Sequence, residues 1–387
     1  MVNKNFLILS ITLLFFLLCG FVFMHMTQKH EKNAIVLGTS LPLSGINSDL
    51  GKDIVIGANT YFSHINARGG IQNKHIQFIH YDDKYEPENT LYNTLKLIQK
   101  DDVFALFGFV GTPTVKRVLP LVSHSNIPFI APYTGASFLR DNEHENIVNF
   151  RSSYAQEMDA LVEYLSTQKK ITKFAIFYQN DDYGEEGYIA LAQALAKRNL
   201  QLSAEGTYKR NTLSIRHAVH EIEGAKPEAI ILVGAYKPTA RFIEKVKSSF
   251  SYQPIFCSIS FVNANALMQE LKGNGENLLF SQTVPSCDDF YSKEGLEYRK
   301  LLSFYYPDAK PSLASFESFL AAKSVVQALQ NIHGSITHDK FLAHLKSLNG
   351  QTLDSIPLSY RNAQLLNQVY LSHYVKEKFE IIQKYEY

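Results

Sequence analysis

Two stretches decide how this chain folds: 131-APYTGASFLR-140 and 174-FAIFYQNDDYGEEG-187. Each starts with the apolar pattern of a buried strand and ends in a polar loop with glycine that opens toward a helix. The first loop carries hydroxyls and free backbone N–H groups that suit a small anion such as a carboxylate. We predict that the two loops are facing walls of a ligand cleft between two α/β lobes.

Strand and helix patterns alternate on both sides of these stretches. One series occupies residues 34–136 and a second occupies residues 155–285. Such alternation predicts parallel sheets that are covered by helices on both faces. After residue 285 the chain has three helical patterns, at 295–305, 315–332 and 338–348, and two strand-like segments, at 367–375 and 379–385.

The order of the segments indicates two similar lobes with several passages of the chain between them. We assign residues 33–152 and 285–355 to lobe one, and residues 153–284 and 356–387 to lobe two. Residues 1–32 are assigned to an N-terminal signal or anchor segment and a linker. Several crossings form a multi-strand hinge, and ligands favour the crevice at the carboxyl ends of parallel strands.

Composition and motifs exclude several classes of function. The 387 residues carry a formal net charge of +1, so no basic excess is available to neutralise nucleic-acid phosphates. The 13 histidines are scattered, and no Cys/His spacing suggests a zinc site. The signatures of serine hydrolases, zinc proteases, phosphate loops and dinucleotide folds are also missing from the sequence. We expect no enzyme activity, no cofactor, no metal and no nucleic-acid partner.

An unbroken apolar run extends from Phe6 to Met24, after the single basic residue Lys4. As a helix with about 1.5 Å per residue it would reach roughly 28 Å, nearly the thickness of a bilayer core. The run is either a signal peptide or an uncleaved anchor that contacts the membrane through residues 6–24. Lipidation at Cys19 is a third, less favoured alternative. Every alternative places the rest of the chain outside the cytoplasmic membrane.

Cys257 and Cys287 each lie near the end of a predicted strand. An oxidising compartment would permit a disulfide between them. The alternative is two separate, half-buried thiols.

Eight short motifs follow one another along the chain: PLSG, INARGGI, LFGFVGTPT, APYTGASFLR, FRSSYAQE, FYQNDDYGEEG, VGAY and SISFV. Their order resembles that of type I periplasmic solute-binding proteins, most closely the leucine/isoleucine/valine-binding subfamily of ABC-importer receptors. The resemblance covers nearly all of residues 34–385. It implies two lobes, each a parallel sheet flanked by helices, joined by a multi-strand hinge with the ligand cleft between them.

The resemblance also implies that an amino acid binds in the cleft with its carboxylate on lobe one. Thr112 falls where the family has a carboxylate-binding serine. Tyr133 and Gly135 fall where the family uses a backbone N–H and a threonine hydroxyl. The adjacent Thr134 could supply this hydroxyl instead.

On lobe two, Tyr183 and Tyr236 match the aromatic residues with which the family covers its ligand. Ser260 falls where the family usually has the glutamate that binds the ligand's ammonium group. A serine cannot supply the counter-charge that a desolvated ammonium needs. Either Asp181 or Asp182 substitutes for the glutamate, or the ligand lacks a simple α-ammonium.

Most of these candidates also have a purely structural interpretation. Thr112 and Thr134 could be helix N-caps, which use the same free N–H groups as an anion site. Tyr183 could be a solvent-exposed or packing tyrosine, and Tyr236 could simply begin a helix. Phe109 offers apolar surface to the ligand if it faces the cleft, and otherwise belongs to the sheet core.

We therefore expect a periplasmic receptor, secreted across or anchored to the cytoplasmic membrane, that binds an amino acid or a related small carboxylate. It would deliver this solute to the membrane permease of an ABC importer by hinge closure, a motion for which periplasmic binding proteins are a known example. The alternative is a membrane-tethered ligand sensor of the same fold that signals to a partner protein.

Overall fold

The computed structural model describes residues 34–141, 143–289 and 291–387. Lobe one is built on a five-stranded sheet with the strand order β2-β1-β3-β4-β5. The β1/β3, β3/β4 and β4/β5 pairs are parallel. The strands are β1 (Ala34–Leu41), β2 (His75–Asp82), β3 (Ala105–Phe107), β4 (Phe129–Ile130) and β5 (Ile147–Val148).

Lobe two is built on a seven-stranded sheet with the order β14-β13-β10-β9-β8-β6-β7. Strands β6 to β10 pair in parallel, whereas β13 and β14 add an antiparallel edge. Its strands are β6 (Phe174–Gln179), β7 (Leu202–Tyr208), β8 (Ala229–Val233), β9 (Ile255–Ser258), β10 (Leu278–Gln282), β13 (Gln368–Val375) and β14 (Lys378–Glu386). A separate hairpin pairs β11 (Thr352–Leu353) with β12 (Ile356–Pro357).

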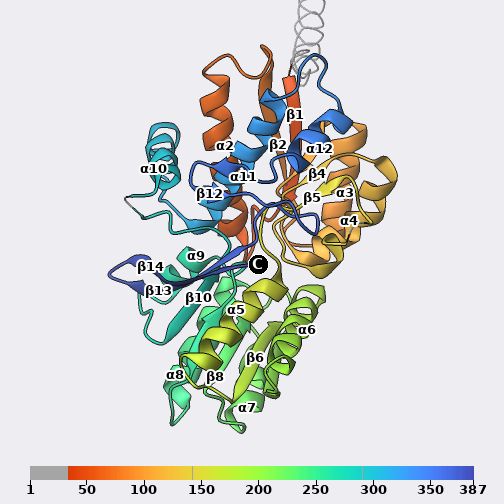
Figure 1. Cartoon of the computed structure of the whole chain (residues 1–387). Coiled ribbons are helices and arrows are strands. Elements are labelled where there is room, and N and C mark those ends of the chain that lie inside the picture. Colours follow the sequence, from red (N-terminus) through yellow and green to blue (C-terminus); the bar gives the residue numbers. More distant parts are fainter. Residues whose placement is uncertain (1–33, 142, 290) are drawn as a thin grey trace, which may run out of the picture. The chain divides into compact units, whose positions relative to one another are not determined.

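Helices connect the parallel strands, as the alternating pattern predicts, so the α/β fold class is confirmed (Figure 1). Lobe one holds α2 (Ser48–Asn66), α3 (Pro87–Gln99), α4 (Thr112–Ser125), the 3-10 turn η1 (Ser137–Leu139), α10 (Lys293–Tyr305), α11 (Leu313–Gln330) and α12 (His338–Lys346). Lobe two holds α5 (Tyr154–Thr167), α6 (Asp182–Ala196), α7 (Arg216–Glu223), α8 (Tyr236–Ser249) and α9 (Ala264–Glu270).

The chain passes between the two sheets after β5, after β10 and before β13. Two of these passages are hydrogen-bonded to each other: Asn149 N–H donates to the Ala363 carbonyl at 2.7 Å, and Leu366 N–H donates to the Phe150 carbonyl at 2.8 Å. The Ser152 hydroxyl adds a 2.7 Å bond to the Gln368 carbonyl. These bonds form the multi-strand hinge, while the lobe boundaries at individual residues stay a prediction.

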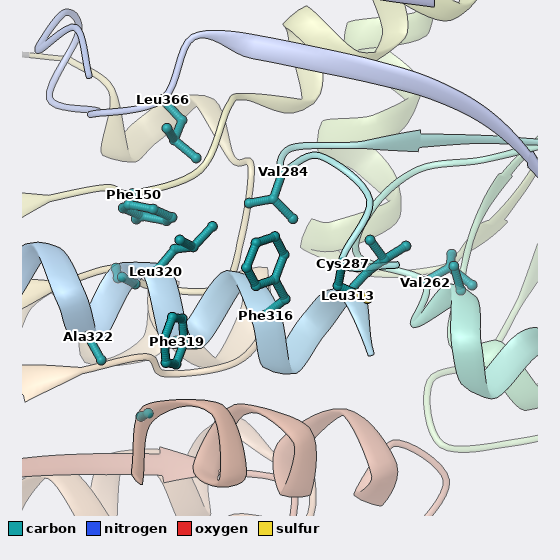
Figure 2. Close-up of a cluster of buried hydrophobic side chains, with 14 of the residues drawn as sticks. Phe150, Val262, Val284, Cys287, Leu313, Phe316, Phe319, Leu320, Ala322 and Leu366 are labelled. Atoms are coloured by element: carbon teal, nitrogen blue, oxygen red, sulfur yellow. The ribbon is translucent and has the colours of Figure 1, made fainter. Parts of the chain in front are cut away.

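Helix α11 is the centre of the lobe-one core. Its side chains are buried almost all round, which is typical of a helix enclosed by other elements rather than one lying on the surface. Figure 2 shows Phe316, Phe319 and Leu320 of α11 among Val284 and Leu366 from the chain passages. The core of lobe one therefore continues into the hinge.

The disulfide considered from the sequence is not formed, because Cys257 and Cys287 are both free, buried thiols. Cys257 lies on β9 in the hydrophobic cluster that includes Ile231 and Leu279, whereas Cys287 packs with Leu313 in the cluster around α11 (Figure 2). The two thiols thus belong to different hydrophobic clusters. Burial raises the pKa of both thiols well above the usual value, which keeps them protonated.

The apolar run at residues 6–24, with Cys19, lies outside the described residues. Among the helices from residue 34 onward, none is long and apolar enough to cross a membrane.

Gly57 sets the distance between α2 and α11, since a Cβ at this position would lie 2.0 Å from the backbone carbonyl oxygen of Ser315. We expect Gly57→Ala to force the two helices apart and to lower the free energy of unfolding by about 2 kcal/mol or more. Chemical denaturation monitored by circular dichroism measures this loss.

Gly224 provides the matched control, because it has a right-handed backbone and nothing within 4 Å of its would-be Cβ. Gly224→Ala should leave stability unchanged or raise it by about 0.4–1 kcal/mol through the unfolded chain. Equal losses in the two variants would contradict the close helix contact.

Candidate ligand-binding site

The sequence candidates gather at the carboxyl ends of strands in both sheets. On lobe one, Thr112 begins α4 after β3, and the Tyr133–Gly135 loop follows β4. On lobe two, Tyr183 lies in the first turn of α6, Tyr236 begins α8, and Ser260 follows β9. This is the edge of a parallel sheet at which α/β proteins place their ligands.

The two threonine hydroxyls of lobe one meet. The oxygen atoms of Thr112 and Thr134 lie 2.7 Å apart, and Thr134 also donates to the Tyr154 hydroxyl at 3.3 Å. Neither threonine is a helix N-cap: Gly111 occupies that position for α4, and Ala136 does so for η1. The cap interpretation is therefore wrong. Both hydroxyls lie at the N-terminal end of α4, beside its free N–H groups.

Gly135 has a steric role in this loop. A Cβ on this residue would lie 2.4 Å from the ring of Tyr154 and 2.6 Å from its backbone nitrogen. The loop can lie against the start of α5 only because residue 135 has no side chain. Phe109 packs edge-on against Phe129 with ring centroids 5.0 Å apart, which is the sheet-core role weighed for it above.

Aromatic rings from both lobes fill the space between the two loops. Phe261 lies at their centre: its ring centroid is 4.4 Å from that of Tyr183, 6.0 Å from Tyr133 and 6.2 Å from Tyr85. Tyr183 also packs on Tyr154 at 5.6 Å. Because all five rings are nearly inaccessible to solvent, they form one continuous layer between the lobes.

Tyr183 is fully buried, and its hydroxyl has no hydrogen-bond partner in the structure. Burial, followed by the neighbouring Tyr154 and Tyr85 hydroxyls, raises the pKa of Tyr183 well above its usual value, so the hydroxyl remains a neutral donor. The solvent-exposed interpretation of this residue is thus wrong. A buried unpaired hydroxyl is costly, and a ligand atom that bonds to it removes the cost.

A buried charge cluster surrounds Ser260. Arg151, which is 1% exposed, lies with Nε 3.0 Å from Glu317 Oε1 as an ion pair and donates from Nη2 to the Ser260 hydroxyl at 2.6 Å. Its guanidinium carbon lies 3.9 Å from the Tyr133 ring centroid, a cation–π geometry. The Ser260 hydroxyl in turn donates to Glu157 at 2.8 Å.

Burial acts on all three charged groups of this cluster. It raises the pKa of Glu157 and of Glu317, and Arg151 counteracts the rise in each case. Burial, the largest single effect, lowers the pKa of Arg151, but Glu317, Tyr133 and Glu157 together outweigh it and raise the pKa. Arg151 therefore carries a permanent positive charge at the centre of the cleft.

Three of the candidates from lobe two are tied to specific partners. Tyr236 donates its hydroxyl to Asp49 of α2 at 2.6 Å. Asp181 caps α6 by accepting the Tyr183 N–H and pairs with Arg210, and Asp182 pairs with Lys116 of α4. Neither aspartate is a free carboxylate facing the threonine pair.

Further contacts join the two lobes at the rim of the cleft. Arg210 of lobe two donates to Glu86 of lobe one at 3.0 Å, in addition to its ion pair with Asp181. Glu186 of α6 accepts from both the N–H and the hydroxyl of Ser137. The structure thus has the two lobes in direct contact on either side of the aromatic layer.

A cavity of about 350 Å³ borders the threonine loop where α5, α6 and η1 meet, with Gly135, Arg140 and Tyr154 in its wall. A much smaller one, of about 10 Å³, lies between Tyr133, Arg151 and Glu317. A hollow of about 660 Å³ between α7 and α8 holds none of the candidate residues. In the described part of the chain, no group of three metal-ligating side chains comes together.

Sequence reasoning missed Phe261, Tyr85, Arg151, Glu157 and Glu317. Phe261 and Arg151 lie inside two of the motifs that carry the family resemblance, SISFV and FRSSYAQE, and that position was the available signal. Nothing local marks Tyr85 or Glu317, since their partners lie far away along the chain.

Asp53 of α2 provides a pH-dependent contact between the lobes. It accepts from Asn263 and Ser312, both at 2.9 Å, and burial raises its pKa to about 6 from a usual 3.8. Protonated Asp53 therefore stabilises the fold below pH 4, and this contribution is lost as the pH rises through about 6.

We expect the free energy of unfolding of wild type, relative to Asp53→Asn, to fall by about 1–3 kcal/mol between pH 4 and pH 7. Denaturant titrations at each pH measure the difference, and Asp308→Asn, at an exposed position, is the control for the loss of one carboxylate. Parallel curves for wild type and Asp53→Asn would show that Asp53 ionises normally.

The chain is similar to known proteins in both sequence and fold. A family model described as periplasmic binding protein matches residues 34–376. A Leu/Ile/Val-binding protein homolog 7 of Brucella abortus is 22% identical over 332 residues, which cover 78% of each chain.

Two solved structures share the fold. One is a possible leucine/isoleucine/valine-binding protein from Rhodopirellula baltica, with 28% identity, a TM-score of 0.86 and coverage of 92% of this chain and 98% of that one. The other is a fatty acid ABC transporter substrate-binding protein from Thermomonospora curvata, with 18% identity, a TM-score of 0.83 and coverage of 92% and 94%.

Proposed function

This chain belongs to the periplasmic binding protein family, and we propose that it is the extracytoplasmic solute-binding receptor of an ABC importer. Its solute would be an amino acid or a related small carboxylate, bound between the lobes. The residues that we assign to the solute are Thr112, Tyr133, Thr134, Gly135, Tyr183, Tyr236 and Ser260, of which Gly135 acts by shaping the site. Phe109, the remaining sequence candidate, packs on Phe129 in the sheet core.

The observation that carries the proposal is the paired hydroxyls of Thr112 and Thr134, 2.7 Å apart at the start of α4. A carboxylate there would accept from both hydroxyls and from the free N–H groups of a helix of 14 residues, whose dipole favours a negative charge. The unpaired Tyr183 hydroxyl from lobe two would complete the site on closure.

The contacts that cross the cleft support a mechanism by hinge closure. Tyr236–Asp49, Arg210–Glu86 and Lys116–Asp182 each join one lobe to the other, so an opening motion would break them. A solute that bonds to both the threonine pair and Tyr183 binds the closed form better than the open one, and it shifts the population accordingly. A shift from 1:99 to 99:1 requires about 5.5 kcal/mol of differential binding.

Curated relatives and structural neighbours support the transport role. The Brucella relative is named for leucine, isoleucine and valine, and the Thermomonospora neighbour for a fatty acid and an ABC transporter. We place the receptor in the periplasm, secreted across or anchored to the cytoplasmic membrane by residues 6–24. A sensor that signals to a partner protein is the second candidate, which an uncleaved anchor would favour.

A binding screen followed by an uptake assay tests the proposal. The full chain, purified in mild detergent, should gain thermal stability with at least one amino acid or small carboxylate, since a ligand at a hundred times its Kd adds about 2.7 kcal/mol. Cells that lack the gene should then lose uptake of that solute. Binding without an uptake defect would favour the sensor.

We expect Tyr183→Phe to weaken binding of the solute found in that screen by about 10- to 150-fold, because it removes one hydrogen bond to a charged group. The stability of the free protein should not fall, since the hydroxyl has no partner to lose. Isothermal titration and thermal melting measure the two effects.

Tyr252→Phe is the matched control, because the Tyr252 hydroxyl is also buried and unpaired but lies outside the cleft, before β9. It should leave affinity unchanged. If Tyr183→Phe binds as tightly as wild type, Tyr183 serves packing and not the solute.

A further inference from the structure

The hydrogen-bonding capacity of the cleft is asymmetric: its carboxylates are already engaged by the protein, whereas two of its donors are not. Glu157 accepts from the Ser260 hydroxyl at one oxygen, and from the Ser260 N–H and the Ser281 hydroxyl at the other, all within 2.6–2.8 Å. Three neutral donors thus satisfy this buried carboxylate without a ligand.

Glu317 is engaged in the same way. Arg151 contacts both of its oxygens, at 3.0 and 3.2 Å, and the Thr283 hydroxyl donates to it at 2.8 Å. Two further carboxylates on α2 are also held: Asp49 accepts from Tyr236, and Asp53 accepts from Asn263 and Ser312.

The unpaired groups next to these carboxylates are donors. Arg151 Nη1 and the Tyr183 hydroxyl are buried without a hydrogen-bond partner among the residues that the structure describes. Both belong to residues that contact the Ser260–Phe261 segment, because Ser260 bonds to Arg151 and Phe261 packs on Tyr183. Arg151 is a fixed positive charge, so a second cation placed here would be repelled as well as left without an acceptor.

We propose that the cleft selects a carboxylate ligand that has no α-ammonium group, such as a deaminated or 2-oxo acid with an apolar body, and that Arg151 and Ser260 determine this specificity. The inference rests on the proposed solute-binding function. The carboxylate lies on the threonine pair, and the aromatic layer of Tyr85, Tyr133 and Phe261 contacts the apolar body. The position next to Ser260, where an ammonium would need an acceptor, is taken by the guanidinium of Arg151.

Matched ligand pairs test the proposal directly. The full chain is titrated calorimetrically with leucine, 4-methylpentanoate and 4-methyl-2-oxopentanoate, and with phenylalanine and 3-phenylpropanoate. Each acid without the ammonium should bind at least tenfold more tightly than its parent amino acid. Tighter binding of the amino acids would overturn the specificity inference and leave the receptor function standing. No binding by any member of either set would overturn the inferred apolar ligand, and the wider screen above then decides the receptor function separately.

The variant Ser260→Ala tests whether the charge cluster around Ser260 causes the preference for acids without an ammonium group. It removes the hydroxyl that Glu157 Oε1 accepts and Arg151 contacts, which frees one carboxylate oxygen for an ammonium. The preference for the deaminated acid, expressed as the ratio of the two Kd values, should fall at least threefold. Ser281→Ala, which frees the other oxygen of Glu157 in part, is a second variant in case the first fails to fold.

Ser372→Ala is the control, because Ser372 is a buried serine of β13 without a hydrogen-bond partner. Its ratio should equal that of wild type. Since a ratio compares two ligands on one protein, a general loss of stability does not change it. An unaltered ratio in both Ser260→Ala and Ser281→Ala would overturn the assignment to this cluster.

Discussion

The burial of one guanidinium, that of Arg151, is the constraint on which the closed cleft depends. An isolated charge in this position would cost several kcal/mol, and only close partners can offset such a cost. Here the partners come from three directions: Glu317 on α11, the Tyr133 ring after β4 and the Ser260 hydroxyl after β9. Two of them belong to lobe one and the third to lobe two. The hydrogen bond from Arg151 to Ser260 is therefore made only when the lobes meet.

The contacts at the rim differ in kind from this buried centre. Lys116 and Asp182 have side chains that are 54% and 34% exposed, and a pair of this sort contributes about 0–1 kcal/mol. Such pairs align the lobes without committing them to one state. The larger contributions to the contact between the lobes come from the aromatic layer around Phe261 and the charge cluster around Ser260. Both of these use residues from the two lobes. A reversible domain motion requires rim contacts that are weak enough to break. It also requires a buried centre in which the ligand supplies the missing hydrogen bonds.

Much of the fold follows from local pattern, and much of the site does not. Alternating strands and helices predict the two parallel sheets, and the strand-end loops locate Thr112, Thr134 and Tyr183 at the carboxyl edges of these sheets. The sequence predicts a polar loop at the end of the stretch 174–187, whereas in the structure Asp181 caps α6 and Asp182 and Tyr183 lie in its first turn. The contacts of Arg151 with Ser260 and Glu317 span 109 and 166 residues, and no local signal encodes a partner at that separation. The free thiols Cys257 and Cys287 illustrate the same limit, since proximity in two predicted strands says nothing of which cluster each side chain enters.

The unpaired Tyr183 hydroxyl has a consequence for how the two states are balanced. A buried donor without a partner costs about 1–3 kcal/mol, and this cost applies only when closure removes the hydroxyl from water. On its own it would favour the open form by about 5- to 150-fold, because each 1.4 kcal/mol is tenfold in an equilibrium constant. A ligand oxygen that accepts from Tyr183 removes that cost in the closed form alone. The same hydroxyl thus opposes closure without a ligand and would favour it with a ligand that accepts from it, which would suit a receptor whose partner recognises only the loaded state.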